Sequence, residues 1–363
     1  MNKTHLVINK KALRANYELI RSKLNDDCRV IGVVKANAYG TDAISVAQQL
    51  INFGVEHLAV AYIDEGIQLR NAGISKPILV FYPQIDNFKA LIDHQLTPSI
   101  YSFTALAAFK DVVTKAGRAA FPVHIKVNTG MNRLGFEISE LKELSKRLED
   151  KVLNVYGVFS HFAASGTPAH RDFTRYQIDR FQQAVNHFKQ DFSSDILFHL
   201  SNSSGILSYP EAAFNAVRAG IALYGYGNHP QEDRQLQPVA ELFAPIIQLR
   251  TVHAGDSVGY ERAFMAKKTC RIATLSIGYA DGIGRIYGKG CAIVKVNGKS
   301  APTCGNICMD TMMVDVSGVD CEEGDMVKVF GNDHSATSFD AYQQSIAYEL
   351  ITRISDRVPR ILK

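Results

Sequence analysis

Residues 29–62, RVIGVVKANAYGTDAISVAQQLINFGVEHLAVAY, contain a strand–helix–strand unit. The segments 29–34 and 57–62 are apolar runs without clean alternation, which is typical of strands that are buried on both faces. Between them, residues 42–53 repeat their apolar side chains with the period of a helix, and Gly54 is suited to end that helix. A polar and glycine-containing stretch, which begins at Lys35, joins the first strand to the helix.

The same alternation extends over about 220 residues. Helices are expected around residues 13–24, 139–149 and 174–189, and another from an N-cap at Asp64 to a C-cap at Gly73. Eight strands separated by helices predict a (β/α)8 TIM barrel, and a doubly wound open sheet is the alternative that periodicity alone does not exclude. The eight expected strands are 29–34, 57–62, 77–82, 97–101, 123–127, 155–160, 196–200 and 215–217.

After about residue 235 the pattern changes to short strands separated by Gly, Asp and Asn. Asn297-Gly298 predicts a hairpin, and residues 338–354 predict a helix. We therefore expect an α/β protein in which residues 1–235 form the barrel and residues 236–363 form a mostly-β domain, with residues 1–9 as candidates to pair with the second domain. The strands expected in it are 244–252, 269–277, 292–296, 312–316 and 326–330.

Composition excludes several classes of protein. The 363 residues are 46% hydrophobic and 21% charged, which is enough apolar material for a core. Lys and Arg number 40 against 36 Asp and Glu, and a dispersed net charge of +4 argues against a nucleic-acid binder. No apolar run reaches the ~20 residues needed to span a bilayer. Residues 1–11 do not resemble a signal peptide, so we expect a cytoplasmic protein.

The six cysteines do not predict a metal site or a disulfide framework. Cys304 and Cys308 have the spacing C-x3-C, but no second Cys or His pair has zinc spacing. With no export signal, the cysteines are expected to be reduced thiols that serve as small buried hydrophobes.

The expected carboxyl ends of the strands carry the chemistry, because active sites of TIM barrels lie there. Lys35 ends the first strand, Lys126 and Arg133 follow from the fifth, and His161 and Arg218 come from the sixth and eighth. A lysine at the end of a buried strand has a lowered pKa, which suits it to Schiff-base chemistry. The alternative is a lysine that reaches solvent at the barrel rim.

The loops after the seventh and eighth expected strands resemble a phosphate site. Ser203, Ser204 and Gly205 in one loop, and Gly220 and Ile221 in the other, offer hydroxyls and backbone N–H groups. A strand lysine together with a phosphate site suggests pyridoxal 5′-phosphate (PLP) as the cofactor.

Eight segments, in the same order along the chain, resemble the alanine racemase family. The family has an N-terminal TIM barrel followed by a β domain, and it interconverts L- and D-alanine on PLP, which supplies D-alanine for peptidoglycan. The resemblance therefore implies an isomerase of this kind. The segments are VVKANAYG (33–40), KVNTGMNRLGF (126–136), FSHFAAS (159–165), VRAGIALYG (217–225), SVGY (257–260), IGYADG (277–282), GNICMD (305–310) and RVPR (357–360).

The resemblance also implies a two-base mechanism. Lys35 would bind PLP covalently and act as the base on one face of the substrate, while Tyr260 would act on the other face. In the family this tyrosine comes from the second subunit, so a homodimer with shared sites is implied. A hydrogen-bonded chain through His161 to Arg218 would help the tyrosine to ionise, and Arg218 would face the pyridine nitrogen.

The other implied roles concern binding. Arg133 would hold the substrate carboxylate or the cofactor phenolate, next to a strand lysine, Lys126, that is often carbamylated in the family. Met309 would offer a backbone N–H to the substrate carboxylate. Tyr279 and Asp310 would shape the mouth of the site from the second subunit. The phosphate and neighbouring parts of PLP would be held by Tyr39, Asn202, Ser203, Gly220 and Ile221.

One departure from the family concerns substrate choice. Asp356 stands just before RVPR, where family members commonly have a tyrosine that contacts the phosphate and narrows the pocket. A smaller residue leaves room for a hydroxymethyl side chain, so we expect weak serine racemisation. A racemase for both alanine and serine is therefore the alternative function.

Two further alternatives are less well supported by the residues. PLP decarboxylases of this barrel type use an acidic residue at the pyridine nitrogen, where this chain has Arg218. Non-catalytic PLP-binding proteins are typically lone barrels without a β domain, and a structural protein would leave the constellation of Lys35, Arg133, His161 and Arg218 unexplained.

Overall fold

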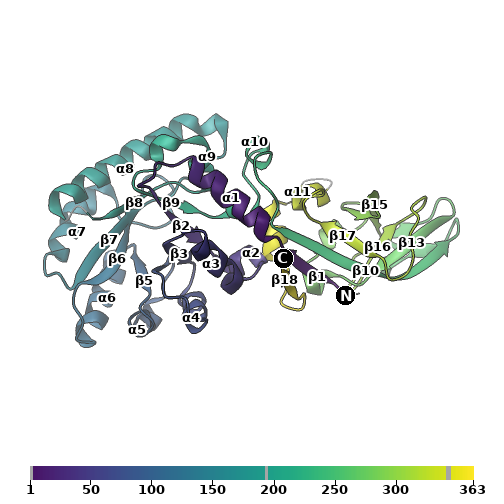
Figure 1. The fold of residues 1–363 in the computed structure, drawn as a ribbon, viewed down its shortest axis with the longest axis horizontal. Coiled ribbons are helices and arrows are strands. Elements are labelled where there is room, and N and C mark those ends of the chain that lie inside the picture. Colours follow the sequence, from purple (N-terminus) through teal and green to yellow (C-terminus); the bar gives the residue numbers. More distant parts are fainter. Residues whose placement is uncertain (1–2, 193–194, 341–344) are drawn as a thin grey trace.

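The computed structural model describes residues 3–192, 195–340 and 345–363. Figure 1 shows two parts side by side along the long axis, a barrel surrounded by helices and a smaller β domain. The long strand β10 (Ala240–Val252) runs from their junction into the β domain. No helix among the described residues is long and apolar enough to cross a membrane.

The first part confirms the predicted barrel. Its parallel sheet has the order β8-β7-β6-β5-β4-β3-β2-β9, so neighbours in sequence pair in space and the last strand returns to the first. A bond from the N–H of Arg218 to the carbonyl of Ser201 (3.0 Å) helps to join β9 to the end of β8. This sequential order excludes the open sheet. The strands are β2 (Arg29–Val33), β3 (His57–Val60), β4 (Ile78–Val80), β5 (Thr97–Ile100), β6 (Phe121–Lys126), β7 (Leu153–Phe159), β8 (Leu197–His199) and β9 (Ala216–Ala219).

The helices of the barrel begin where polar side chains cap them. Asn9 accepts hydrogen bonds from two N–H groups of α1, and Asp42 accepts one from Ser45 (2.7 Å) at the start of α3. The expected cap at Asp64 is wrong, because the N-cap is Tyr62, two residues earlier, and the Glu65 carboxylate accepts a bond from the N–H of Tyr62. The helices are α1 (Lys10–Ser22), α2 (Lys35–Gly40), α3 (Ala43–Asn52), α4 (Ile63–Asn71), α5 (Phe88–Asp93), α6 (Phe103–Lys115), α7 (Leu141–Leu148), α8 (Arg171–Asp191), α9 (Ser203–Ser208) and α10 (Pro230–Asp233).

The second part is a mostly antiparallel sheet of order β13-β16-β15-β14-β17-β10-β1-β18, in which β13 also pairs with β10. Both ends of the chain contribute to it, because β1 lies between β10 and β18. Besides β10, its strands are β1 (His5–Ile8), β13 (Cys270–Leu275), β14 (Ile293–Val296), β15 (Lys299–Cys304), β16 (Met312–Asp315), β17 (Met326–Phe330) and β18 (Arg360–Leu362); β11 (Ser257–Val258) and β12 (Phe264–Met265) form a separate hairpin.

Two local predictions in this part have different outcomes. The hairpin at Asn297-Gly298 is confirmed, since both residues have positive φ (48° and 78°) and β14 pairs with β15 across them. A single helix over 338–354 is wrong. The structure has α11 (Ala336–Phe339) and α12 (Ala347–Thr352) instead, and the expected residues 341–344 lie outside the described part of the chain.

Candidate active site

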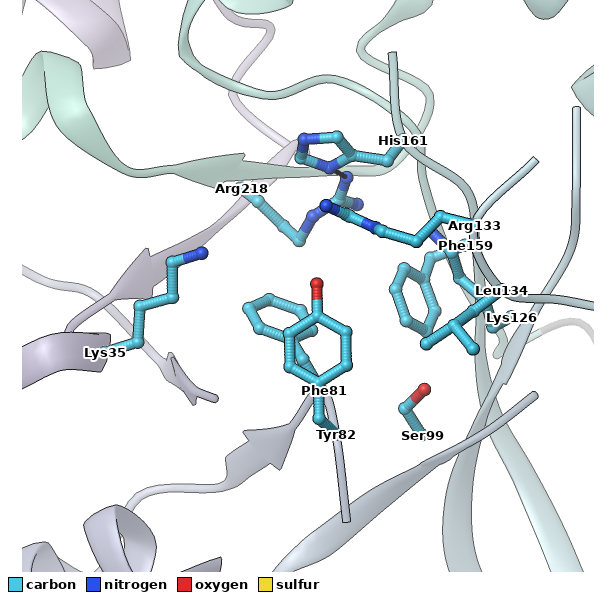
Figure 2. Close-up of a pocket in the computed structure, with 10 residues that line it drawn as sticks. All are labelled: Lys35, Phe81, Tyr82, Ser99, Lys126, Arg133, Leu134, Phe159, His161 and Arg218. Atoms are coloured by element: carbon cyan, nitrogen blue, oxygen red, sulfur yellow. Dashed lines mark hydrogen bonds between the residues drawn. The ribbon is translucent and has the colours of Figure 1, made fainter. Parts of the chain in front are cut away.

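The amino group of Lys35 lies in a cavity at the carboxyl end of the barrel strands. Lys35 follows β2, and its side chain extends into the cavity towards Arg218, while the hydroxyl of Tyr82 points into it from β4 (Figure 2). The structure thus brings together five predicted residues from different parts of the sequence, namely Lys35, Lys126, Arg133, His161 and Arg218. The lining residues are Lys35, Phe81, Tyr82, Ser99, Lys126, Arg133, Leu134, Phe159, His161 and Arg218.

The backbone after Lys35 adopts an unusual conformation. Residues 36–39 have φ between 51° and 54°, which is left-handed and costs roughly 1–2 kcal/mol per residue outside glycine. Glu65 offsets part of this cost, because one carboxylate oxygen accepts a bond from the N–H of Ala36 (2.6 Å). On the far side, the Arg360 guanidinium donates to the carbonyls of Gly40 and Thr41 (3.0 Å each). One side chain from helix α4 and one from the last strand, β18, therefore fix the turn that follows Lys35.

Burial and charge make Lys35 a weaker base than an exposed lysine. Burial lowers the pKa of Lys35, the Arg133 guanidinium lowers it further, and Glu65 raises it in part. The amine therefore loses its proton at a lower pH than an ordinary lysine, as a nucleophile and proton carrier needs.

Arg218 is the most extensively bonded cation of the cavity. It is 3% exposed, and its guanidinium donates to the carbonyls of Ser160 (2.7 Å), His199 (2.8 Å) and Leu200 (3.0 Å). It also bonds the Nδ1 atoms of His199 (2.8 Å) and His161 (3.0 Å). Burial lowers its pKa to about 9, yet it stays predominantly charged at neutral pH.

Lys126 and Arg133 are two further basic side chains that line the cavity. The Nζ atom of Lys126 lies 4.5 Å from the centre of the Phe159 ring, and burial holds its pKa well below the ordinary value. The guanidinium of Arg133 lies 5.8 Å from the centre of the Tyr82 ring. A cation–π contact is available to each of these side chains.

A second pocket adjoins the first and shares Lys35, Phe81, His161 and Arg218 with it. Here the Ser203 hydroxyl accepts bonds from the N–H groups of Gly220 and Ala222 (3.1 Å each). A Cβ atom at Gly220 would lie 2.7 Å from the Tyr39 hydroxyl, so only glycine keeps this corner open. The lining residues are Val33, Lys35, Tyr39, Phe81, His161, Asn202, Ser203, Arg218, Gly220, Ile221, Asn228 and Tyr348.

Together the two pockets fit an anionic cofactor that reacts with an amine. Among the described residues that line them, none is acidic, whereas Lys35, Lys126, Arg133 and Arg218 are basic. The hydroxyls and glycine of the second pocket can accept a phosphate, and the lysine stands at the border between the pockets. No group of three or more His, Cys, Asp or Glu residues suited to a metal occurs in the described part of the chain.

The predicted residues of the β domain do not line the Lys35 pockets within one chain. Tyr260 is 70% exposed and lines a separate surface hollow with Met313 and Cys308. Its turn is held by the Asn306 side-chain amide, which donates to the carbonyl of Tyr260 (3.1 Å) and to Glu261 (3.0 Å). Two other predicted residues, Met309 (53%) and Tyr279 (42%), are also exposed. Asp310 accepts a bond from Arg357 (2.8 Å).

Near the C-terminus, the residue that lines the second pocket is not the predicted one. Asp356 is exposed and lines neither pocket, whereas Tyr348 from α12 lines the second pocket and donates to the Asn228 side chain (2.7 Å). Four lining residues, Tyr348, Asn228, Phe81 and Tyr82, were not predicted from the sequence. For Phe81 and Tyr82 a signal existed, because both lie at the end of an expected strand; for Tyr348 and Asn228 no local pattern marks the contact.

Comparison with known proteins gives one family. Residues 8–228 match the model of the alanine racemase N-terminal domain, and residues 239–362 match that of the C-terminal domain. A protein named alanine racemase 1 from Oceanobacillus iheyensis is 35% identical over 360 residues, which cover 96% of this chain and 95% of that protein. An alanine racemase of Methanococcus maripaludis is 35% identical over 367 residues, 98% of this chain and 97% of that one.

Solved structures agree in fold over the full length. The alanine racemase of Streptomyces lavendulae superposes with a TM-score of 0.93 at 30% identity, covering 100% of this chain and 97% of that one. The alanine racemase of Bartonella henselae, solved with covalently bound pyridoxal phosphate, gives a TM-score of 0.89 at 29% identity and covers 99% of each chain.

Proposed function

The chain belongs to the alanine racemase family, and we propose that Lys35 binds PLP and that this site interconverts L- and D-alanine. The observation that carries the proposal is the pairing of a partly buried lysine of lowered pKa with an arginine, Arg218, in a pocket whose lining has no described acidic residue. The enzyme is thus a PLP-dependent isomerase of amino acids.

When bound, PLP supplies an electron-withdrawing ring that makes the α-proton of the attached amino acid acidic. The amine of Lys35 then serves as the base on one face, because its lowered pKa makes the neutral, proton-accepting form more accessible than in an exposed lysine. Arg133 extends into the same cavity, where its cation would orient the substrate carboxylate. Lys126, which lines the same cavity, is the proposed position of a carbamate.

Arg218 favours racemisation over other PLP reactions. A guanidinium has only donors and remains protonated, so it cannot give a proton to the pyridine nitrogen that it would face. A cofactor ring that faced this guanidinium would be a weaker electron sink than one paired with a carboxylate, which would favour racemisation over decarboxylation and transamination.

The phosphate would lie in the second pocket. Ser203, Asn202 and Tyr39 offer polar side-chain atoms there, and Gly220 and Ile221 line the same corner. Tyr348, which the sequence did not predict, stands where it can supply a further hydroxyl.

We propose that a second copy of the chain completes each site. Tyr260 is 70% exposed and lines neither Lys35 pocket in its own chain, so an opposite-face base at Tyr260 requires a partner subunit. Met309, Tyr279 and Asp310 would come to the site from the same partner, and their exposure in the single chain supports this arrangement.

Mixing two inactive variants tests the shared site. Lys35→Ala and Tyr260→Phe are each expected to lose racemisation. After subunit exchange, half of the molecules are mixed dimers with one intact site out of two, so about one quarter of wild-type activity returns. No recovery after verified subunit exchange would place Tyr260 outside the shared site.

Chiral chromatography of L-alanine and L-serine incubated with the enzyme and PLP tests the substrate. Fast alanine turnover with little serine turnover is the expected result. Comparable serine turnover would support the broader racemase, and Asp356→Tyr then tests whether Asp356 is responsible. Because Asp356 lines neither pocket, we expect that substitution to leave the ratio of serine to alanine activity unchanged.

The cytoplasm is the proposed location. All six cysteines are free thiols, which favours a reducing compartment. Supply of D-alanine for peptidoglycan is the role that the family assigns to such an enzyme.

A further inference from the structure

The bonds of Arg218 continue into the barrel interior, away from the cofactor pockets. Beyond His199, the Nε2 atom of that ring lies 2.8 Å from the Nδ1 atom of His124. His124 is on β6, is 2% exposed and lines neither Lys35 pocket. A chain of four side chains, His161–Arg218–His199–His124, therefore connects the active site to the core of the barrel.

The donor chemistry of arginine fixes the tautomers along this chain. A guanidinium can only donate, so the Nδ1 atoms of His161 and His199 must accept, and neutral rings then carry their proton on Nε2. For His199 this proton points at the Nδ1 atom of His124, which must accept it. His124 in turn carries its own proton on Nε2, so each bond allows only one orientation of the next ring.

The charge of Arg218 also favours neutral imidazole rings along this chain. Among the described groups, every acceptor that Arg218 bonds is a carbonyl or an imidazole, and none is a carboxylate. A protonated His199 would place a second cation against the buried guanidinium. Burial and the neighbouring cation hold the pKa of His199 well below its ordinary value, and burial lowers the pKa of His124 to about 3.

The barrel makes room for the His124 ring at one position. A Cβ atom on Gly157, in the middle of β7, would lie 2.3 Å from the Nδ1 atom of His124. The φ angle of Gly157 is not in the left-handed region, so the backbone does not require glycine there. The glycine is needed because it leaves room for the His124 ring.

We propose that His124 is a positioning residue of the racemase site: by accepting the Nε2 proton of His199, it fixes that ring and thereby Arg218 and His161. It does not touch substrate or cofactor, and it acts only through His199. The inference rests on the proposed role of Arg218 in racemisation.

A matched pair of variants tests the acceptor. His124→Asn places a side-chain oxygen close to the position of Nδ1, whereas His124→Leu has the same shape without an acceptor. We expect His124→Leu to lower kcat about tenfold, as one unmade buried hydrogen bond can, with a smaller change in KM. Rescue of kcat by His124→Asn is expected. Equal losses in both variants would overturn the proposal, and so would full activity of His124→Leu.

Two further variants separate this effect from general damage to the core. Gly157→Ala keeps every histidine but displaces the His124 ring, so kcat should fall as in His124→Leu. Tyr156→Phe removes the bond between the Tyr156 hydroxyl and His57 (2.7 Å), beside the His124 ring but outside the chain, and should leave kcat unchanged. A loss in Tyr156→Phe as large as that in His124→Leu would contradict the proposal.

Nitrogen NMR of histidine-labelled wild-type protein gives a readout that does not depend on activity. The ring of His199, assigned by its absence in His199→Asn, should be neutral with its proton on Nε2 from pH 6 to 8. A proton on Nδ1, or titration within this range, would overturn the tautomer argument. The racemase assay of the wild-type enzyme tests the proposed function separately, so failure of one is distinguishable from failure of the other.

Discussion

The carboxylate of Glu65 holds the peptide group that follows Lys35: its Oε1 atom accepts a bond from the N–H of Ala36 at 2.6 Å. Its other oxygen accepts from the N–H groups of Ala61 (2.6 Å) and Tyr62 (3.2 Å) at the end of β3. One side chain of α4 thus ties the end of β2 to the end of β3, and it does so at the start of the left-handed turn 36–39.

Glu65→Gln should weaken PLP binding about tenfold and destabilise the fold by about 1–3 kcal/mol. A carboxamide has one acceptor oxygen, so its NH2 group would face either Ala36 or the pair Ala61 and Tyr62. Absorbance titration with PLP and urea unfolding measure the two effects. Asp64→Asn is the control, because Asp64 is the exposed neighbour on the same helix. Wild-type affinity in Glu65→Gln would contradict the role of this bond.

Tyr348→Phe should lower affinity for PLP severalfold, because it removes a hydroxyl from the pocket proposed for the phosphate. Binding of pyridoxal, which lacks the phosphate, shows whether the Tyr348 hydroxyl acts on the phosphate. We expect pyridoxal binding to be unchanged, and equal losses for both compounds would argue that Tyr348 acts by packing alone. Tyr176→Phe, at an exposed tyrosine of α8, serves as the control.

Tyr260→Phe should bind PLP but lose exchange of the α-proton from L-alanine by a factor of about 10²–10⁴, the usual contribution of a positioned acid or base. Exchange from D-alanine should be far less affected, because Lys35 serves that face. Proton NMR in deuterated water measures both exchanges. Equal loss from the two enantiomers would contradict the two-base assignment.

The free energy of unfolding should fall as the pH is lowered. The reason is that the buried imidazoles stay neutral in the folded protein, whereas the same rings bind protons in the unfolded chain. Burial lowers the pKa of His124 to about 3 and that of His57 to about 4, both below the reference of about 6.5 for an unfolded chain. Between these values the unfolded state binds more protons, so the free energy of unfolding rises with pH. Each ring contributes up to about 1.4 kcal/mol per pH unit between pH 6 and 4.

Urea unfolding from pH 7.5 down to pH 4 checks this slope. His124→Asn removes one of the imidazoles with a lowered pKa and should give a shallower decline than the wild type. An identical slope would mean that His124 does not stay neutral in the folded protein.

The barrel could be predicted from sequence because each of its strands is short, apolar and followed by a helical segment, so a local pattern identifies each one. The ends of the helices were harder to predict than their existence. Helix α4 begins at Ile63, before Asp64, because the side chain of Glu65 accepts a bond from the N–H of the N-cap residue Tyr62. The helix expected over 338–354 failed because periodicity does not show where a segment is interrupted.

Sequence by itself determined the strand ends that carry Lys35, Lys126, His161 and Arg218, because in a parallel barrel all carboxyl ends meet on one face. It did not determine that Tyr348 rather than Asp356 enters the second pocket, or that His124 bonds His199. Those contacts join residues far apart in the chain, and only the packing of the barrel interior and of the C-terminal helix brings them within bonding distance. The exposure of Tyr260 was likewise decided by tertiary structure, since a turn sequence does not reveal which surface will cover it.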